Sequence, residues 1–254
     1  MRRIWKNFVG YVLLVASCAG CADNATGPVV TPEITVIYAN QDISVDGQLT
    51  ESVWQKAPVY RLLVPGAQGS QTLESGKVCL AWNERYLFLA VRFVDSDILA
   101  TGQEDQLPHF SLGDVAEFFL WPQDQTWYWE VFATPLGKKS FFFFAGGGSL
   151  KSLGDCQEIK VTARMEGTVN NWHDRDCSWS AEVAIPWTTL TADGKPSPRG
   201  PWRFLAGRYN WSRYLPRTEL SSFPLLPKVD FHDRGNYARL RFQNSDGKEV
   251  QIPR

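Results

Sequence analysis

Two cysteines near the start of the chain carry the most specific chemistry in the sequence. Cys18 and Cys21 follow the apolar run from Phe8 to Ala16, which is itself preceded by a basic start. This run is too short to span a bilayer as a stable anchor, and its positive flank is typical of the core of a signal peptide. A thiol at the end of such a segment can take a lipid.

The residues before each cysteine distinguish the two candidates. In Val15-Ala16-Ser17-Cys18 a branched apolar residue stands three positions before the cysteine, with small residues between, whereas the tetrapeptide ending at Cys21 has only the small pair. Small residues let the chain lie extended in the signal peptidase. We predict a lipoprotein signal peptide over residues 1–20, cleaved before Cys18 or Cys21. The alternative is an ordinary secretory signal with incidental cysteines.

The residues after the signal peptide predict where the protein is located. Residues 21–33 are small, polar and interrupted by Pro and Gly, which is typical of a flexible tether. We therefore expect a domain in the bacterial cell envelope, lipid-anchored to a membrane and facing the periplasm or the cell surface.

A pair of carboxylates, Glu117 and Glu130, lies on adjacent predicted strands. Two such groups could act as the acid and base of a glycosidase, or could accept hydrogen bonds from sugar hydroxyls. They could also be solvated side chains paired with Arg203 or Arg208. The three histidines come without the Gly-x-Ser-x-Gly elbow that would support a nucleophilic serine. We expect binding rather than catalysis.

Composition limits the partners. Removing the signal peptide leaves 26 − 3 = 23 basic residues against 27 acidic ones, a net charge of −4, so we expect no nucleic-acid partner. Eleven Trp and fifteen Phe are enough to fill a core and also to form an exposed stacking surface. Beyond the signal, Cys79, Cys156 and Cys177 are an odd number, which leaves at least one thiol unpaired. A Cys156–Cys177 disulfide is possible.

Short alternating runs separated by Gly, Pro, Asn and Asp dominate the rest of the chain. They predict one all-β domain over residues 34–254, an antiparallel β-sandwich of the jelly-roll or immunoglobulin-like kind. Helical turns are expected only at 50–56 and 186–190. The expected strands are 77–82, 86–94, 115–121, 127–133, 141–145, 158–165, 178–185, 202–209 and 237–242.

The order of these elements resembles family 9 carbohydrate-binding modules and their relatives in the DOMON-like superfamily. Six segments are similar to the family's motifs and follow the same order. They are Ile43–Trp54 (ISVDGQLTESVW), Trp82–Asp95, Gly113–Leu120 (GDVAEFFL), Tyr128–Gly137, Trp179–Trp187 (WSAEVAIPW) and Phe231–Phe242.

The resemblance implies a non-catalytic β-sandwich that binds an oligo- or polysaccharide, often at a chain end and often with structural calcium. Its binding cleft draws one aromatic side chain from the loop that opens the last strand, which corresponds to Phe231. It draws another from the loop before Val115, where Phe110 stands in place of the expected Trp. Glu117 and Glu130 would accept hydrogen bonds from hydroxyls, and His232 adjoins the cleft.

Further residues complete the expected site. Trp211 lies in a polar loop and is free to touch a ligand, as is Trp172. Asp95 and Asp114 match family positions and could give hard oxygen ligands to calcium, although turn-capping aspartates have the same pattern. The tryptophans at motif positions are expected to pack in the core: Trp54, Trp82, Trp179, Trp187 and Trp202.

Two other functions remain open. Relatives of this sandwich bind b-type haem through Met, His or Lys, and Met165 is the one methionine after the start. The chain could also be a structural or protein-binding lipoprotein, an alternative favoured by the missing Trp of the sugar site.

Overall fold

The computed structural model describes residues 31–66, 68–146, 150–190 and 201–250. The predicted signal peptide, Cys18, Cys21 and most of the predicted tether lie outside these residues. No helix among the described residues is long and apolar enough to cross a membrane.

Strands form where hydrophobic and polar residues alternate, and all nine expected runs are strands. Two short helices, α1 (Ser52–Lys56) and α2 (Trp187–Leu190), occupy the expected helical turns. Four strands were not expected: β1 (Glu33–Tyr38), β2 (Tyr60–Arg61), β8 (Leu150–Leu153) and β12 (Glu219–Phe223). The others are β3 (Gly76–Trp82), β4 (Tyr86–Val94), β5 (Val115–Pro122), β6 (Tyr128–Ala133), β7 (Lys139–Ala145), β9 (Lys160–Glu166), β10 (Ser178–Pro186), β11 (Trp202–Asn210) and β13 (Ala238–Phe242).

The strands form one curled, mixed sheet in the order β8-β7-β6-β5-β11-β13-β1-β3-β4-β10-β9, with β12 on β11 and β2 on β3. β1 joins the two halves, because Glu33–Val36 pair with β13 and Ile37–Tyr38 pair with β3. Both pairings are parallel, so the prediction of a wholly antiparallel arrangement was wrong at β1. Parallel neighbours need a long crossover, and the chain between β1 and β13 supplies it.

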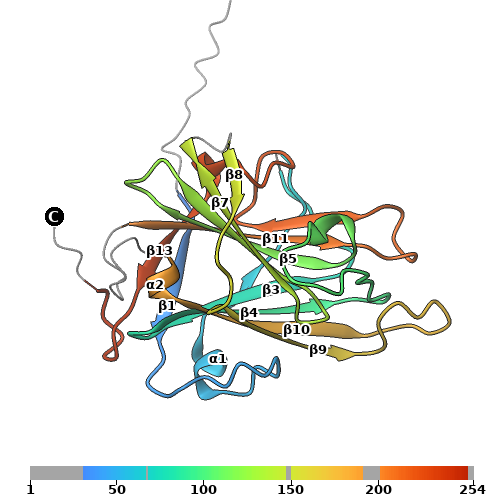
Figure 1. Ribbon diagram of the computed structural model, residues 1–254, viewed down its shortest axis with the longest axis horizontal. Coiled ribbons are helices and arrows are strands. Elements are labelled where there is room, and N and C mark those ends of the chain that lie inside the picture. The colour runs from blue at the N-terminus through green and yellow to red at the C-terminus, as the bar shows by residue number, and fades with distance from the viewer. Residues whose placement is uncertain (1–30, 67, 147–149, 191–200, 251–254) are drawn as a thin grey trace, which may run out of the picture. The chain divides into compact units, whose positions relative to one another are not determined.

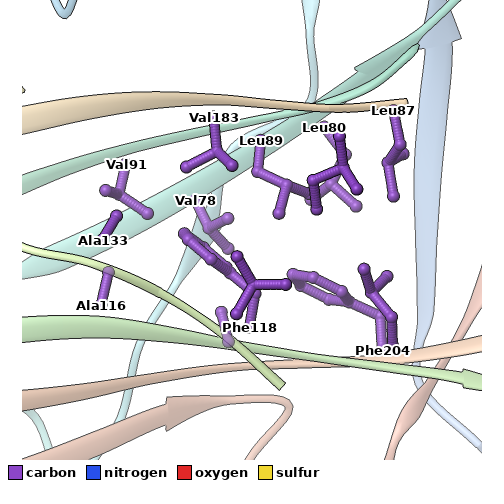
Figure 2. Close-up of a cluster of buried hydrophobic side chains, with 14 of the residues drawn as sticks. Val78, Leu80, Leu87, Leu89, Val91, Ala116, Phe118, Ala133, Val183 and Phe204 are labelled. Atoms are coloured by element: carbon purple, nitrogen blue, oxygen red, sulfur yellow. The ribbon is translucent and has the colours of Figure 1, made fainter. Parts of the chain in front are cut away.

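The two halves of the sheet face each other across the main core. Figure 1 shows β3, β4 and β10 in one layer and β5 and β11 in the other, with α1 on the outer side of the first. In Figure 2, Leu80, Leu89 and Val183 from one layer point toward Phe118 and Phe204 from the other. All five tryptophans that the sequence assigned to packing are buried, at 1–8% exposure.

A buried glutamate explains two of the sequence motifs. Glu182 on β10 accepts hydrogen bonds from the backbone N–H groups of Asp46 and Gly47 and from Trp54 Nε1. Gly47 has φ +80°, and a Cβ there would lie 2.9 Å from the backbone of Ala163. The segment that includes Asp46, Gly47 and Trp54 is thus tied to the segment that includes Glu182, over the outer side of β10.

Candidate functional site

The outer face of the β5, β6, β7 and β11 layer, opposite the main core, holds the candidate site. Glu130 stands opposite Phe119 in the register, and Glu117 is two residues from Phe119, so the two glutamates lie on this face together. The backbone register sets Glu117 opposite Phe132 on one side and Gly207 on the other. The buried aromatic members of this outer face are Phe119, Tyr128, Phe132, Phe142, Phe144, Phe231 and Tyr237.

Glu117 is a buried carboxyl group without a polar partner. Its residue is 3% exposed, and among the described residues none donates a hydrogen bond to the carboxylate. Burial, followed by the charge of Glu130, raises the pKa of Glu117 well above its ordinary value. A bare carboxylate in such surroundings has a strong tendency to take up a proton or a cation.

Glu130 differs because a cation stands beside it. Lys151 Nζ lies 3.5 Å from Glu130 Oε2, an ionic contact rather than a close hydrogen bond. Burial nevertheless raises the pKa of Glu130 to about 7, against the lowering effect of Lys151. The same ammonium lies 3.5 Å from the centroid of the Phe142 ring and 5.3 Å from that of Phe144. This is a cation–π arrangement.

Phe231, one of the two aromatic residues that the resemblance places in the site, packs directly on the sheet. Its residue is 6% exposed, and its ring lies over Gly207, where a Cβ would approach the ring to 2.7 Å. Glycine at 207 is therefore required by the close approach of this ring. Phe231 also packs edge-on against Phe119 and Tyr209.

Phe110, the other aromatic residue of the predicted site, is 37% exposed and comes from the short 3-10 turn His109–Ser111. Its ring centroid lies 5.8 Å from that of Tyr209 and 6.3 Å from that of Phe132. Trp211 Nε1 donates a hydrogen bond to the carbonyl of Phe110 at 3.1 Å. Phe110 thus reaches the outer face, and half-buried Trp211 supports its turn.

His232 is exposed and lies at the other side of the same face. Its Nδ1 is 2.8 Å from the hydroxyl of Tyr128, and partial burial lowers its pKa, as does the charge of Lys151. This contact joins the loop that carries His232 to β6. The guanidinium of Arg234 lies over the rings of Trp121 and Tyr128, at 4.8 and 5.1 Å.

The aspartates predicted for calcium have protein partners instead. Asp95 Oδ2 accepts hydrogen bonds from Arg208 Nη2 at 3.0 Å and Trp179 Nε1 at 3.1 Å. The two oxygens of Asp114 accept the backbone N–H groups of Leu99 and Trp211, each at 2.7 Å. Burial is the main reason why the pKa values of Asp95 and Asp114 are raised.

Arg208 already supplies the positive charge that a metal would bring to Asp95, so this arrangement does not fit a calcium ion there. Across the described ranges, no group of three or more His, Cys, Asp or Glu side chains could hold a metal ion. Calcium binding therefore stays a prediction of the resemblance.

Sequence reasoning missed several members of this face. Lys151 was missed because β8 has only four residues, LKSL, and no clear strand pattern. Gly207 was missed because the need for a glycine appears only in the folded structure, where the ring of Phe231 lies over it. The expected pairing of the two glutamates with Arg208 or Arg203 was wrong. Arg208 lies on the inner face against Asp95, and Arg203 donates to Gln123 and to the carbonyl of Tyr237.

The remaining predictions fall outside the outer face. Cys79, Cys156 and Cys177 are all unpaired in the described structure, so the possible Cys156–Cys177 disulfide is not formed there. Met165, the candidate haem ligand, is half-buried and packs against the main core.

Solved structures share this fold. A candidate carbohydrate-binding protein from Bacteroides uniformis matches with a TM-score of 0.69 at 14% identity, covering 84% of this chain and 100% of that one. A family 9 carbohydrate-binding module from Caldicellulosiruptor kristjanssonii, solved with cellotriose and with glucose, matches with a TM-score of 0.51. That match has 14% identity and covers 87% of this chain and 100% of the module. No model of a known protein family matches the chain, and no curated protein matches its sequence. The all-β fold that the resemblance implies is thus shared with these carbohydrate-binding structures.

Proposed function

We propose that the chain is a non-catalytic carbohydrate-binding β-sandwich, held to a bacterial membrane by a lipid on Cys18 or Cys21. It captures glycan chains, including chain ends, for neighbouring enzymes or transporters of the cell envelope. In this proposal the domain binds sugar on its outer face, and the predicted tether over residues 21–33 sets how far that face can extend from the membrane.

The observation that carries this proposal is the combination of side chains on the outer face. Sugar rings present apolar C–H faces and a rim of hydroxyls, and they are bound by aromatic rings and by carboxylates. Phe110 offers a partly exposed ring, and Glu117 and Glu130 lie on the same face. The solved module with this fold that holds cellotriose supports the same ligand class.

Replacing Phe110 with alanine is expected to weaken glycan binding by about fivefold, since an aromatic contact of this kind contributes on the order of 1 kcal/mol. Affinity electrophoresis of the full chain in gels containing glucan or xylan, followed by calorimetric titration with cello-oligosaccharides, measures the change. Tyr86→Ala is the matched control, because Tyr86 is a half-buried aromatic residue of the other layer, where its ring packs against Phe88. A folded wild-type chain that no glycan retards would overturn the proposal.

The anchor has its own test. Cells that make the full chain and grow with a radiolabelled fatty acid are expected to label the protein. The label should be lost in the double variant Cys18→Ala, Cys21→Ala and retained in one of the two single variants, which identifies the lipidated residue. An unlabelled wild-type protein in the soluble fraction would contradict the lipoprotein prediction.

A further inference from the structure

The outer face already holds one ammonium group. Lys151 Nζ lies between the carboxylate of Glu130 and the ring of Phe142, 3.5 Å from the Oε2 atom and 3.5 Å from the ring centroid. A buried carboxylate and an aromatic ring are together a favourable environment for a compact cation, because the carboxylate balances its charge and the ring quadrupole attracts it.

Glu117 has the same surroundings without the cation. It lies diagonally across the β5–β6 pair from Glu130, in the register between Phe132 and Gly207. The ring of Phe231 covers Gly207, and Tyr209 and Phe110 continue the row of contacting rings. Lys151 reaches Glu117 only through its longer-range charge, whereas its contact is with Glu130.

The charges of this face are therefore unbalanced in one place. With both glutamates ionised, Lys151 compensates Glu130, and no described residue donates a hydrogen bond to the buried Glu117 or forms an ion pair with it. Of the other charged groups nearby, Arg234 is committed to the rings of Trp121 and Tyr128. A neutral sugar hydroxyl could donate to Glu117, but only a cationic group would also balance its charge.

We propose that the outer face binds glycans built from amino sugars in their ammonium form, with the ammonium group held by Glu117. The aromatic row from Phe110 to Phe231 contacts the sugar, and the carboxylate of Glu117 accepts hydrogen bonds from the ammonium group, as Glu130 takes the charge of Lys151. This inference rests on the proposed function and names the substrate class of the same site.

Calorimetric titration of the full chain with three oligosaccharides of equal length tests the proposal. The probes are a glucosamine oligomer, its N-acetylated counterpart and a cello-oligosaccharide, which share a backbone and differ at one substituent. The titration is run as a pH series, because the amine must carry its proton while Glu117, whose pKa is raised by burial, must have lost its own. The glucosamine oligomer is expected to bind about tenfold more tightly than either neutral probe, since a hydrogen bond to a charged group is stronger.

The variant Glu117→Gln keeps the size and hydrogen-bonding capacity of the side chain and removes its charge. It is expected to abolish the preference for the glucosamine oligomer over the neutral probes, a ratio of affinities that a hydroxyl contact shared by all three probes does not change. Glu158→Gln is the control for loss of one negative charge, because Glu158 is an exposed residue outside this face. Circular dichroism and thermal melting check that each variant is folded.

The outcomes separate the two proposals. Equal binding of all three probes, or a preference that survives in Glu117→Gln, overturns the assignment of amino sugars and leaves carbohydrate binding standing. Absence of binding to every probe by the folded wild-type chain overturns both. If Glu117→Gln does not fold, the wild-type preference and its weakening by added salt decide the question, because attraction between an ammonium and a carboxylate is screened by salt.

Discussion

Replacing Arg208 with methionine is expected to lower the free energy of unfolding by about 3–5 kcal/mol. Arg208 and Asp95 are both 0% exposed, and Nη2 of the arginine lies 3.0 Å from Oδ2 of the aspartate. The guanidinium also donates to the backbone carbonyls of Glu74 and Val94 and lies over the ring of Phe93. Methionine would fill much of the volume but would leave the buried Asp95 carboxylate without its counter-charge and would remove a donor from each of two backbone carbonyls.

Urea denaturation of the full chain near neutral pH measures this change. Arg241→Met is the matched control, since Arg241 also contacts two carboxylates, those of Glu33 and Glu249, but its side chain is 43% exposed. Exposed ion pairs contribute about 0–1 kcal/mol. Equal losses in the two variants would show that Arg208 contributes no more than a surface arginine.

The second large effect is a dependence of stability on pH that Glu130 produces. Burial raises the pKa of Glu130 from 4.5 to about 7. Between these values the folded chain holds more protons than the unfolded chain, so its stability falls as pH rises. The contribution of Glu130 is fully present below about pH 4.5 and lost above about pH 7. It amounts to about 3 kcal/mol.

The variant Glu130→Gln is expected to flatten this part of the stability curve, because a glutamine does not titrate. Urea denaturation at intervals between pH 4.5 and pH 7 compares it with the wild type. Glu117 contributes in the same direction, since its pKa is also raised, so a residual slope is expected. Glu158→Gln should keep the full slope. A stability that rises with pH in the wild type and in both variants would contradict the assignment.

The sequence predicted the strands whose own residues determine them. Tyr86–Val94 alternates between faces over nine residues, and the Asn83-Glu84-Arg85 turn joins it to the preceding strand. β12 was missed because its residues, ELSSF, are mostly polar. β1 was missed as a parallel strand because its partner β13 begins more than 200 residues later, and no local pattern encodes such a pairing.

The candidate site, like the strands, could be predicted only where its features depend on local sequence. The sequence motifs placed Glu117 and Glu130 on adjacent strands, from which the two side chains could share one face. Their surroundings depend on register between distant strands. Arg208 lies on the inner face because Gly207, and not its neighbour, stands opposite Glu117, and this offset of one residue is invisible in the sequence.

The way β1 joins the two halves of the sheet also has a mechanical consequence. The predicted anchor lies at the N-terminal side of this strand, so a glycan that is pulled while bound would load the chain through residue 31. β1 runs parallel to both partners, and a pull along its axis would shear its ladders to β13 and β3 together rather than open them one bond at a time. The predicted tether would therefore pull on a strand that is paired with both β13 and β3.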